Sequence, residues 1–328
     1  MTKHTRRSVL ATGSAFVAAT LMPRLAVASA SVPVRLTSVK FGSVSWLIDT
    51  IRWEGIDKKH DLNLQVVEVS NNQAAPVALL SHAADVIVSD WTWALRQRAK
   101  GGDLKFAPYS SALGSVMVRK DGPIKSLADL EGKKIGVAGT GIDKSWILLR
   151  AYSRKTLGKD IASIAEPVFG AAPLVTEEFR NGRIDAVLNF WTYAARLQAE
   201  GAQQLLTMAD VVKGLDVAPT PPLVGFIWSE KQVRDNGVPV DKLLAAVADA
   251  NHVLASSDDA WQRLRPLIKP ASDAELIAIR DYYRSGITGS WGVAETAAAK
   301  KLTDLLIELG DTELVGDGTH FDQNLFHT

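Results

Sequence analysis

The sequence predicts an α/β protein made of two similar lobes, each a mostly parallel sheet flanked by helices, followed by helices at the C-terminal end. Three observations support this prediction. The chain repeats itself at an offset of 100 residues, apolar patterns typical of strands and helices alternate within each copy, and 328 residues suffice for two domains.

The repeat is clearest where residues 85–101 read DVIVSDWTWALRQRAKG and residues 185–201 read DAVLNFWTYAARLQAEG. Average composition would give roughly one identity by chance over this length. Seven identities are found: Asp85/Asp185, Trp91/Trp191, Thr92/Thr192, Ala94/Ala194, Arg96/Arg196, Ala99/Ala199 and Gly101/Gly201. The offset is the size of a small domain. We therefore expect two similar domains that face each other across a cleft, and clefts between domains are where ligands bind.

Each copy alternates strand and helix, which predicts a parallel sheet covered by helices. The first copy has expected strands at residues 34–39, 64–69 and 85–88, and expected helices at residues 46–53, 71–80 and from 91. The second copy has expected strands at residues 134–137, 165–168 and 185–188, and helices near residues 141, 175 and 190. Residues 242–256, 260–267 and 294–309 are predicted to be helical.

The chain is expected to pass between the lobes twice, which would make a hinge. Residues 110–118 read as a strand leading from one lobe into the other, and the chain returns around residues 218–226. The first lobe is therefore predicted to comprise residues 31–112 with 222–328, and the second lobe residues 113–221.

Residues 1–30 read as an export signal of the twin-arginine type. A basic stretch containing Arg6 and Arg7 precedes an apolar run from Val9 to Leu21, and a small-x-small cleavage pattern ends at Ala30. The apolar run is too short to span a membrane. We expect cleavage after about Ala30 and a periplasmic mature protein.

Composition excludes several classes of function. Removing the basic residues Lys3, Arg6, Arg7 and Arg24 changes the formal charge from +1 to −3, so nucleic acid is not an expected partner. The chain has no cysteine, which excludes disulfides and thiolate chemistry. The histidines lack the spacing of metal ligands, and the glycine-rich stretch at residues 136–141 lacks the lysine that a phosphate-binding loop needs next. No cofactor, metal or catalytic residue is predicted, although a hard metal ion held by acidic residues such as Asp49, Asp90 and Asp143 stays open as a minor alternative.

Two motifs carry a family resemblance. Residues 121–137, DGPIKSLADLEGKKIGV, and residues 181–186, NGRIDA, resemble stretches of bacterial periplasmic solute-binding proteins. The nitrate/sulfonate/taurine group is the most similar, together with binders of thiamine-pyrimidine precursors, and the resemblance covers residues 34–226. It implies a two-lobed type II fold, a monomer, a small-molecule solute and an inner-membrane ABC permease as partner, without enzyme activity.

The resemblance leaves the solute open between a sulfonate-like and an aromatic or pyrimidine-like molecule. Two other functions also remain open: an enzyme on the same scaffold that acts on a pyrimidine-like substrate, and a sensor subunit that presents its ligand to a signalling partner. Iron-using pyrimidine synthases resemble this fold too, but they rely on a cysteine cluster that this chain lacks.

Candidate ligand contacts follow from the rule that ligands lie beyond the carboxyl ends of the strands in open α/β sheets. Helix N-termini there offer free N–H groups, small residues allow close approach, and tryptophans supply flat walls. The candidates are Ser43, Ser45, Trp46, Asp90, Trp91, Ser110, Gly139, Thr140, Asp143, Asn189 and Trp191.

The candidate contacts also have structural interpretations, which stay open at this point. Asp90 and Asn189 have the residue types that cap helices, and Trp46 starts an apolar helix and suits a core. Lys144 could neutralise an anion, but it is expected to be a solvated lysine. In the repeat, Ser89-Asp90 is replaced by Asn189-Phe190, so we expect an acidic side and an apolar side to the cleft.

Overall fold

The computed structural model describes residues 31–39, 42–70, 74–289, 291–309, 316 and 318–327. Residues 31–328 form one compact unit. The predicted signal peptide and its cleavage site lie outside the described residues, as do residues 71–73, where a helix was expected to begin.

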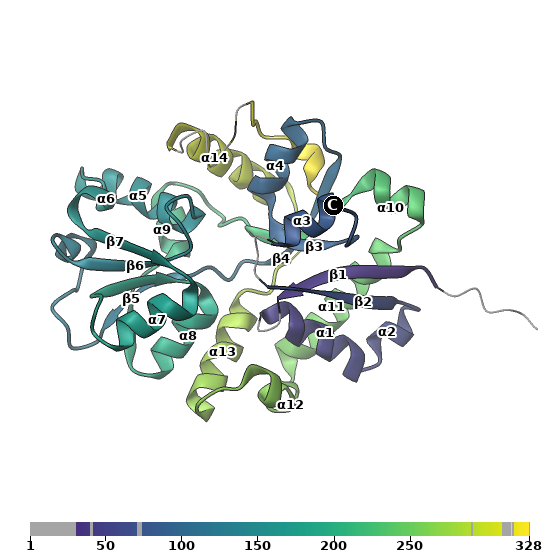
Figure 1. Ribbon diagram of the computed structural model, residues 1–328, viewed down its shortest axis with the longest axis horizontal. Coiled ribbons are helices and arrows are strands. Elements are labelled where there is room, and N and C mark those ends of the chain that lie inside the picture. Colours follow the sequence, from purple (N-terminus) through teal and green to yellow (C-terminus); the bar gives the residue numbers. More distant parts are fainter. Residues whose placement is uncertain are drawn as a thin grey trace, which may run out of the picture. The chain divides into compact units, whose positions relative to one another are not determined.

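The described elements alternate along most of the chain and become helical toward its end (Figure 1). The strands are β1 (Pro33–Val39), β2 (Asn63–Val69), β3 (Ile87–Asp90), β4 (Leu104–Ser110), β5 (Ser115–Arg119), β6 (Lys134–Ala138), β7 (Glu166–Gly170), β8 (Ala186–Asn189), β9 (Ala202–Thr207) and β10 (Val224–Ser229). The α-helices are α1 (Ser43–Trp53), α2 (Ile56–Lys59), α3 (Ala74–Leu80), α4 (Trp91–Ala99), α5 (Lys144–Leu157), α6 (Ile161–Ile164), α7 (Ala172–Arg180), α8 (Trp191–Ala199), α9 (Met208–Gly214), α10 (Glu230–Asn236), α11 (Val240–Ser256), α12 (Asp258–Ile268), α13 (Asp273–Ser285) and α14 (Val293–Leu309). Two short 3₁₀ helices are η1 (Leu127–Leu130) and η2 (Gln323–Leu325).

The repeat seen in the sequence is also a repeat of strand order. One sheet has the order β7-β6-β8-β5-β9. Strands β1 and β2 pair in parallel, β3-β10-β4 form a second ladder, and a parallel bridge between Leu36 and Val86 links the two ladders. The combined order β2-β1-β3-β10-β4 matches the first sheet strand for strand. We call residues 33–110 the first repeat and residues 134–207 the second repeat.

Both sheets are mostly parallel, as predicted, but each contains one antiparallel strand. Strand β5 runs antiparallel to β8 and β9, and β10 runs antiparallel to β3 and β4. Each of these strands completes the sheet of one repeat just after the chain leaves the other. The prediction of one strand over residues 110–118 was therefore wrong, because β4 ends at Ser110 and β5 begins at Ser115 in a different sheet.

The alternation of side chains along the strands gives the sheet of the second repeat two apolar faces. On one face Val116, Ile135 and Leu188 pack in a cluster with α5 and α9. On the other face Met117 and Val187 pack in a cluster with α7 and α8. Figure 1 shows α5 and α9 on one side of these strands and α7 and α8 on the other. Both faces are buried, as expected for strands that lack a polar side.

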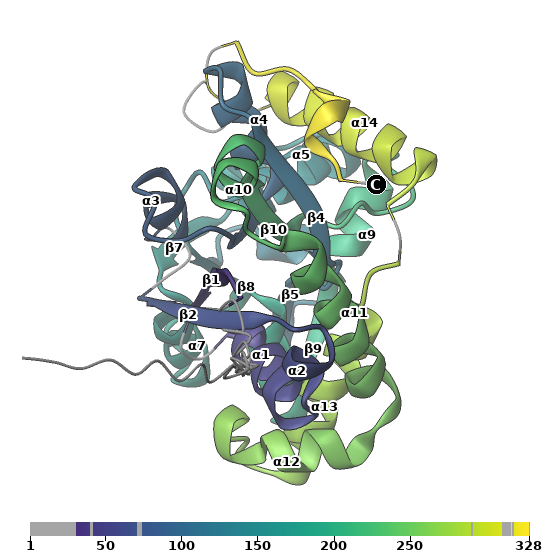
Figure 2. The same ribbon diagram turned by 90° about the vertical axis from the view of Figure 1, so that its right-hand side faces the viewer.

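The C-terminal helices complete the core of the first repeat. A cluster of buried side chains joins β1, through Val34 and Leu36, to α1 and to α11, α12 and α13. Figure 2 shows α11 running beside α1 and α2, with α12 and α13 beyond them. Helix α14 instead packs with α4 and α5 in another cluster. These helices therefore belong to the folded core and are not an appended segment.

Candidate ligand-binding site

The helices that follow β1 and β8 meet at their N-terminal ends through two tryptophans. Trp46 of α1 and Trp191 of α8 lie edge to face, with ring centroids 6.0 Å apart. Trp46 also packs against Trp261 at 6.2 Å, and Trp191 against Tyr283 at 6.3 Å. Such edge-to-face pairs are favourable beyond the area that they bury. One aromatic contact therefore joins the first repeat to the second.

The helices that follow β3 and β6 meet through an ion pair. Asp90 ends β3 and caps α4, where its Oδ1 accepts a hydrogen bond of 2.8 Å from the Trp93 N–H. Lys144 begins α5, and its Nζ donates to Asp90 Oδ2 at 2.9 Å. The Thr92 hydroxyl also donates to Asp90 Oδ1. The expectation that Lys144 is a solvated lysine was wrong, because its side chain is only 26% exposed and pairs across the repeats.

Both members of this pair keep their charge. Burial alone would raise the pKa of Asp90, but the Lys144 ammonium and the hydrogen bonds from Thr92 and Trp93 outweigh it and lower that pKa to about 2. Burial would lower the pKa of Lys144, but the nearby carboxylates of Asp90 and Asp143 outweigh it and raise that pKa. Burial raises the pKa of Asp143.

The two contacts join equivalent pairs of helices in the repeat. Helix α1 corresponds to α5, and α4 corresponds to α8, each at an offset of about 100 residues. If each helix is replaced by its equivalent in the other repeat, the α1–α8 contact becomes the α5–α4 contact. One is aromatic and the other is charged. Both lie at the carboxyl ends of parallel strands, where ligands of open α/β sheets bind.

The three predicted serines lie at strand ends or helix starts of the first repeat. Ser43 begins α1, and its hydroxyl accepts a hydrogen bond of 3.1 Å from the Tyr109 hydroxyl. Ser45 donates to the Gly42 carbonyl at 2.6 Å. Ser110 ends β4, and its hydroxyl accepts from the Ala112 N–H. All three therefore have local partners, and a contact with ligand stays a prediction.

The predicted loop between β6 and α5 is shaped by a glycine. Gly139 has φ of +113°, a conformation that L side chains rarely adopt. Asp143 caps α5 by accepting from the Ser145 N–H at 2.9 Å, and the exposed Thr140 accepts the Asp143 N–H through its carbonyl. This loop brings Lys144 to the start of its helix.

Trp91 and Asn189 lie in the interior. The Trp91 side chain is 0% exposed, and its indole N–H donates to the Pro222 carbonyl at 2.9 Å. Asn189 is also buried and donates to the Ala172 carbonyl and the Thr176 hydroxyl. The packing and capping interpretations describe both residues in this conformation, and their contact with ligand stays a prediction.

An apolar surface at the carboxyl edge of the second sheet was missed in the sequence, apart from Phe190. It comprises Ile142, Phe169, Leu174 and Phe190, which are 42%, 41%, 55% and 38% exposed. We call these four residues the apolar edge. Phe169 packs edge to face on Trp146 with centroids 5.9 Å apart. The available signal was the position of each residue at the end of a strand, in the turn that follows it or in the first turn of the next helix, where an apolar residue is not needed for the core.

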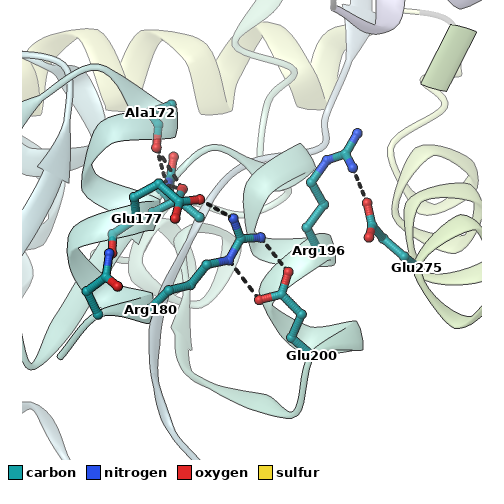
Figure 3. Close-up of polar contacts among 9 residues, drawn as sticks. Ala172, Glu177, Arg180, Arg196, Glu200 and Glu275 are labelled. Atoms are coloured by element: carbon teal, nitrogen blue, oxygen red, sulfur yellow. Dashed lines mark hydrogen bonds and ion pairs between the residues drawn. The ribbon is translucent and has the colours of Figure 1, made fainter. Parts of the chain in front are cut away.

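Ion pairs support the second repeat and tie it to the C-terminal helices (Figure 3). Arg180 of α7 pairs with Glu177 and Glu200. Arg196 of α8 reaches Glu275 of α13, a carboxylate that is 4% exposed in its side chain. Glu275 also accepts a hydrogen bond from the Ala271 N–H, so this buried carboxylate has two partners. Helix α8 is thus held firmly beside the Trp46–Trp191 contact.

Other features of the described residues lie apart from these contacts. A cavity of about 430 Å³ is lined by α14 and residues 320–323 and includes none of the predicted ligand contacts. Among the residues that the structure describes, no cluster of acidic or histidine side chains could hold a metal ion. Within the same part of the chain, no helix has the length and apolar character needed to cross a membrane.

Comparison with known proteins identifies the family. The family model described as NMT1/THI5 like matches residues 57–260, which is more than half of the chain. The chain belongs to the NMT1/THI5-like family. This confirms the resemblance seen in the motifs at residues 121–137 and 181–186. A family relative, a protein of Haemophilus influenzae named as a putative thiamine biosynthesis protein, is 28% identical over 137 residues. That match covers 41% of this chain and 42% of the relative.

Solved structures confirm that this member of the NMT1/THI5-like family has the periplasmic binding protein fold. The alkanesulfonate-binding protein SsuA of Xanthomonas axonopodis, bound to MOPS, superposes with a TM-score of 0.68 at 16% identity, covering 89% of this chain and 97% of that one. The periplasmic aliphatic sulphonate-binding protein SsuA of Escherichia coli has a TM-score of 0.68 at 18% identity, covering 89% and 92%. At these identities the likeness establishes the fold alone.

Proposed function

We propose that this protein is the solute-binding component of an ABC importer and captures a small organic solute between its two repeats. The observation that carries the proposal is the pair of symmetry-related contacts at the strand ends, Trp46 with Trp191 and Asp90 with Lys144. Each contact brings two helix N-termini together at the carboxyl ends of strands, where this class of fold binds ligands, one through aromatic side chains and the other through charged groups.

The solute belongs to one of two classes. The structural neighbours bind sulfonates by name, which supports a sulfonate-like solute. The relative from Haemophilus influenzae is named for thiamine biosynthesis, which supports an aromatic, pyrimidine-like solute. The protein binds its solute without turnover.

Binding would draw together a first lobe of residues 31–112 with 222–328 and a second lobe of residues 113–221. The links between them are residues 111–114 and 218–223, which connect strands of different sheets. Closure requires only that the solute binds the closed form better than the open form. The closed monomer then docks on an inner-membrane permease, after export to the periplasm and removal of residues 1–30.

A thermal-shift screen tests this proposal with sulfonates, nitrate, pyrimidines, thiamine, aromatic acids and metal ions. A ligand at 100 times its dissociation constant stabilises the folded protein by about 2.7 kcal/mol. Trp191→Ala should weaken binding of the hit at least tenfold by calorimetry. The control is Trp53→Ala, because Trp53 is 70% exposed and lies at the far end of α1. Equal losses in the two variants would contradict the site, and product detected by mass spectrometry would contradict binding without turnover.

A further inference from the structure

The two charges of the Asp90–Lys144 ion pair cancel each other. Asp90 and Lys144 form an ion pair at 2.9 Å across the two repeats. Lys144 is also attracted by Asp143 and repelled by Arg96. The two members of the pair carry opposite charges, so the pair as a whole is neutral.

The Asp90 carboxylate is also well supplied with donors. It accepts hydrogen bonds from the Lys144 ammonium, the Thr92 hydroxyl and the Trp93 N–H. A carboxylate has about four acceptor positions, so little capacity remains for a cationic ligand. The Lys144 ammonium has three N–H donors, of which Asp90 takes one. The pair therefore offers hydrogen-bond donors more readily than it offers a charge.

A charged ligand would gain no net charge attraction from the intact pair, and it would have to break the pair to gain one. An anion that took Lys144 would leave Asp90 partly buried without its counter-charge, since the Asp90 side chain is 16% exposed. Breaking a fully buried pair in this way reduces affinity by two to three orders of magnitude. The residual exposure of both side chains brings the expected penalty here to about 10- to 100-fold.

Parts of the apolar edge lie close to Lys144 in the chain and on the neighbouring strand. Ile142 precedes Lys144 in the loop after β6, Phe169 lies in β7, which pairs with β6, and Leu174 lies in α7. A methyl group placed on Gly141 would lie 3.7 Å from the Phe169 ring, so this loop touches the edge directly. Exposed apolar side chains here favour a ligand with an apolar or aromatic face.

We propose that the solute is uncharged, with an apolar face toward the apolar edge and hydrogen-bond acceptors toward Lys144, and that the Asp90–Lys144 pair is retained when it binds. This inference rests on the proposed function and narrows it. It favours an uncharged aromatic solute over a sulfonate-like anion, although sulfonate-binding proteins share the fold.

Calorimetric titration with isosteric probes tests the inference. The sets are benzamide, benzoate and benzamidine, then methyl phenyl sulfone and benzenesulfonate, then hexanamide and hexanoate. In the wild type, the uncharged member of a binding set should bind at least tenfold more tightly than the charged members. A charged member that binds as tightly as its uncharged isostere would overturn the inference and leave the proposed function standing. Failure of every probe, charged or uncharged, would reject the proposed function and the inference with it.

Variants of the pair should switch the preferred charge. Asp90→Asn removes the carboxylate that pairs with Lys144 and should favour anions about tenfold, whereas Lys144→Met should favour cations by a similar factor. The double variant removes both charges and should again favour the uncharged probe, even if a single variant folds poorly. Lys155→Met is the matched control on the same helix, because Lys155 pairs with Asp216 at an exposed position. An unchanged preference in both single variants would overturn the inference.

Discussion

The two contacts between the repeats occupy equivalent positions yet differ in chemistry. At one, the edge-to-face pair of Trp46 and Trp191 is backed by Trp261 and Tyr283. At the other, Asp90 and Lys144 form an ion pair. The positions equivalent to Asp90 and Lys144 are Phe190 and Val44, so the repeat replaces a charge with an apolar group at both partners. A duplicated backbone thus supplies two similar places, and substitution gives each its own role.

The aromatic contact should have the larger effect on stability. Trp46→Ala removes a buried ring that contacts two other tryptophans, and we expect a loss of about 3–5 kcal/mol in the free energy of unfolding. Urea denaturation followed by circular dichroism measures it. The Trp191→Ala variant, in which a less buried ring is removed, should lose less. A loss under about 1 kcal/mol for Trp46→Ala would show that the contact contributes little.

The charged contact should show its effect through pH. The pKa of Asp90 is lowered to about 2 in the folded protein, against an ordinary value of 3.8. The carboxylate therefore stabilises the fold by about 2 kcal/mol above pH 4, and this contribution is lost as the pH falls from about 4 toward 2. The difference in unfolding free energy between wild type and Asp90→Asn should be constant from pH 5 to 8 and shrink below pH 4. A difference that instead grows below pH 4 would contradict this assignment.

A change at the start of α8 should have a smaller effect on stability. It should stabilise the fold while weakening ligand binding. Asp90 caps α4 with its side chain, whereas Phe190 at the same position of α8 makes no side-chain cap. Phe190→Ser supplies the missing acceptor and should stabilise the fold by up to about 1 kcal/mol. The same change removes part of the apolar edge and should weaken binding of the uncharged probe. If binding were unaffected, Phe190 would lie outside the site.

The smallest effect is expected away from both contacts. Lys155→Met breaks an exposed ion pair with Asp216, and such pairs contribute about 0–1 kcal/mol. We expect a change below about 0.5 kcal/mol in unfolding free energy and no change in probe binding. A larger loss in unfolding free energy would mean that replacing any lysine of α5 by methionine destabilises this helix. The loss measured for Lys155→Met would then have to be subtracted from that of Lys144→Met.

Much of the architecture could be predicted because it depends on local pattern. The offset of 100 residues, the periodicity of the apolar residues and the capping residues are visible in the chain, and they place β1–β3, β6–β8 and the helices after them near their observed bounds. The places of β5 and β10 were not predictable in this way. Whether a strand completes its own repeat or the other one depends on contacts between distant residues.

The candidate site was only partly visible in the sequence for the same reason. Residue type alone predicts a turn at Gly139 and a helix cap at Asp143. It also predicts a helix cap at Asp90. The sequence does not reveal that Lys144, 54 residues away, neutralises Asp90, nor that Trp191 rather than Trp91 faces Trp46. Sequence alone determined the repeat, the helix starts and the family, because these follow from local spacing and residue type. The tertiary structure decided which equivalent residues meet across the repeats, because burial and charge pairing depend on what lies opposite in space.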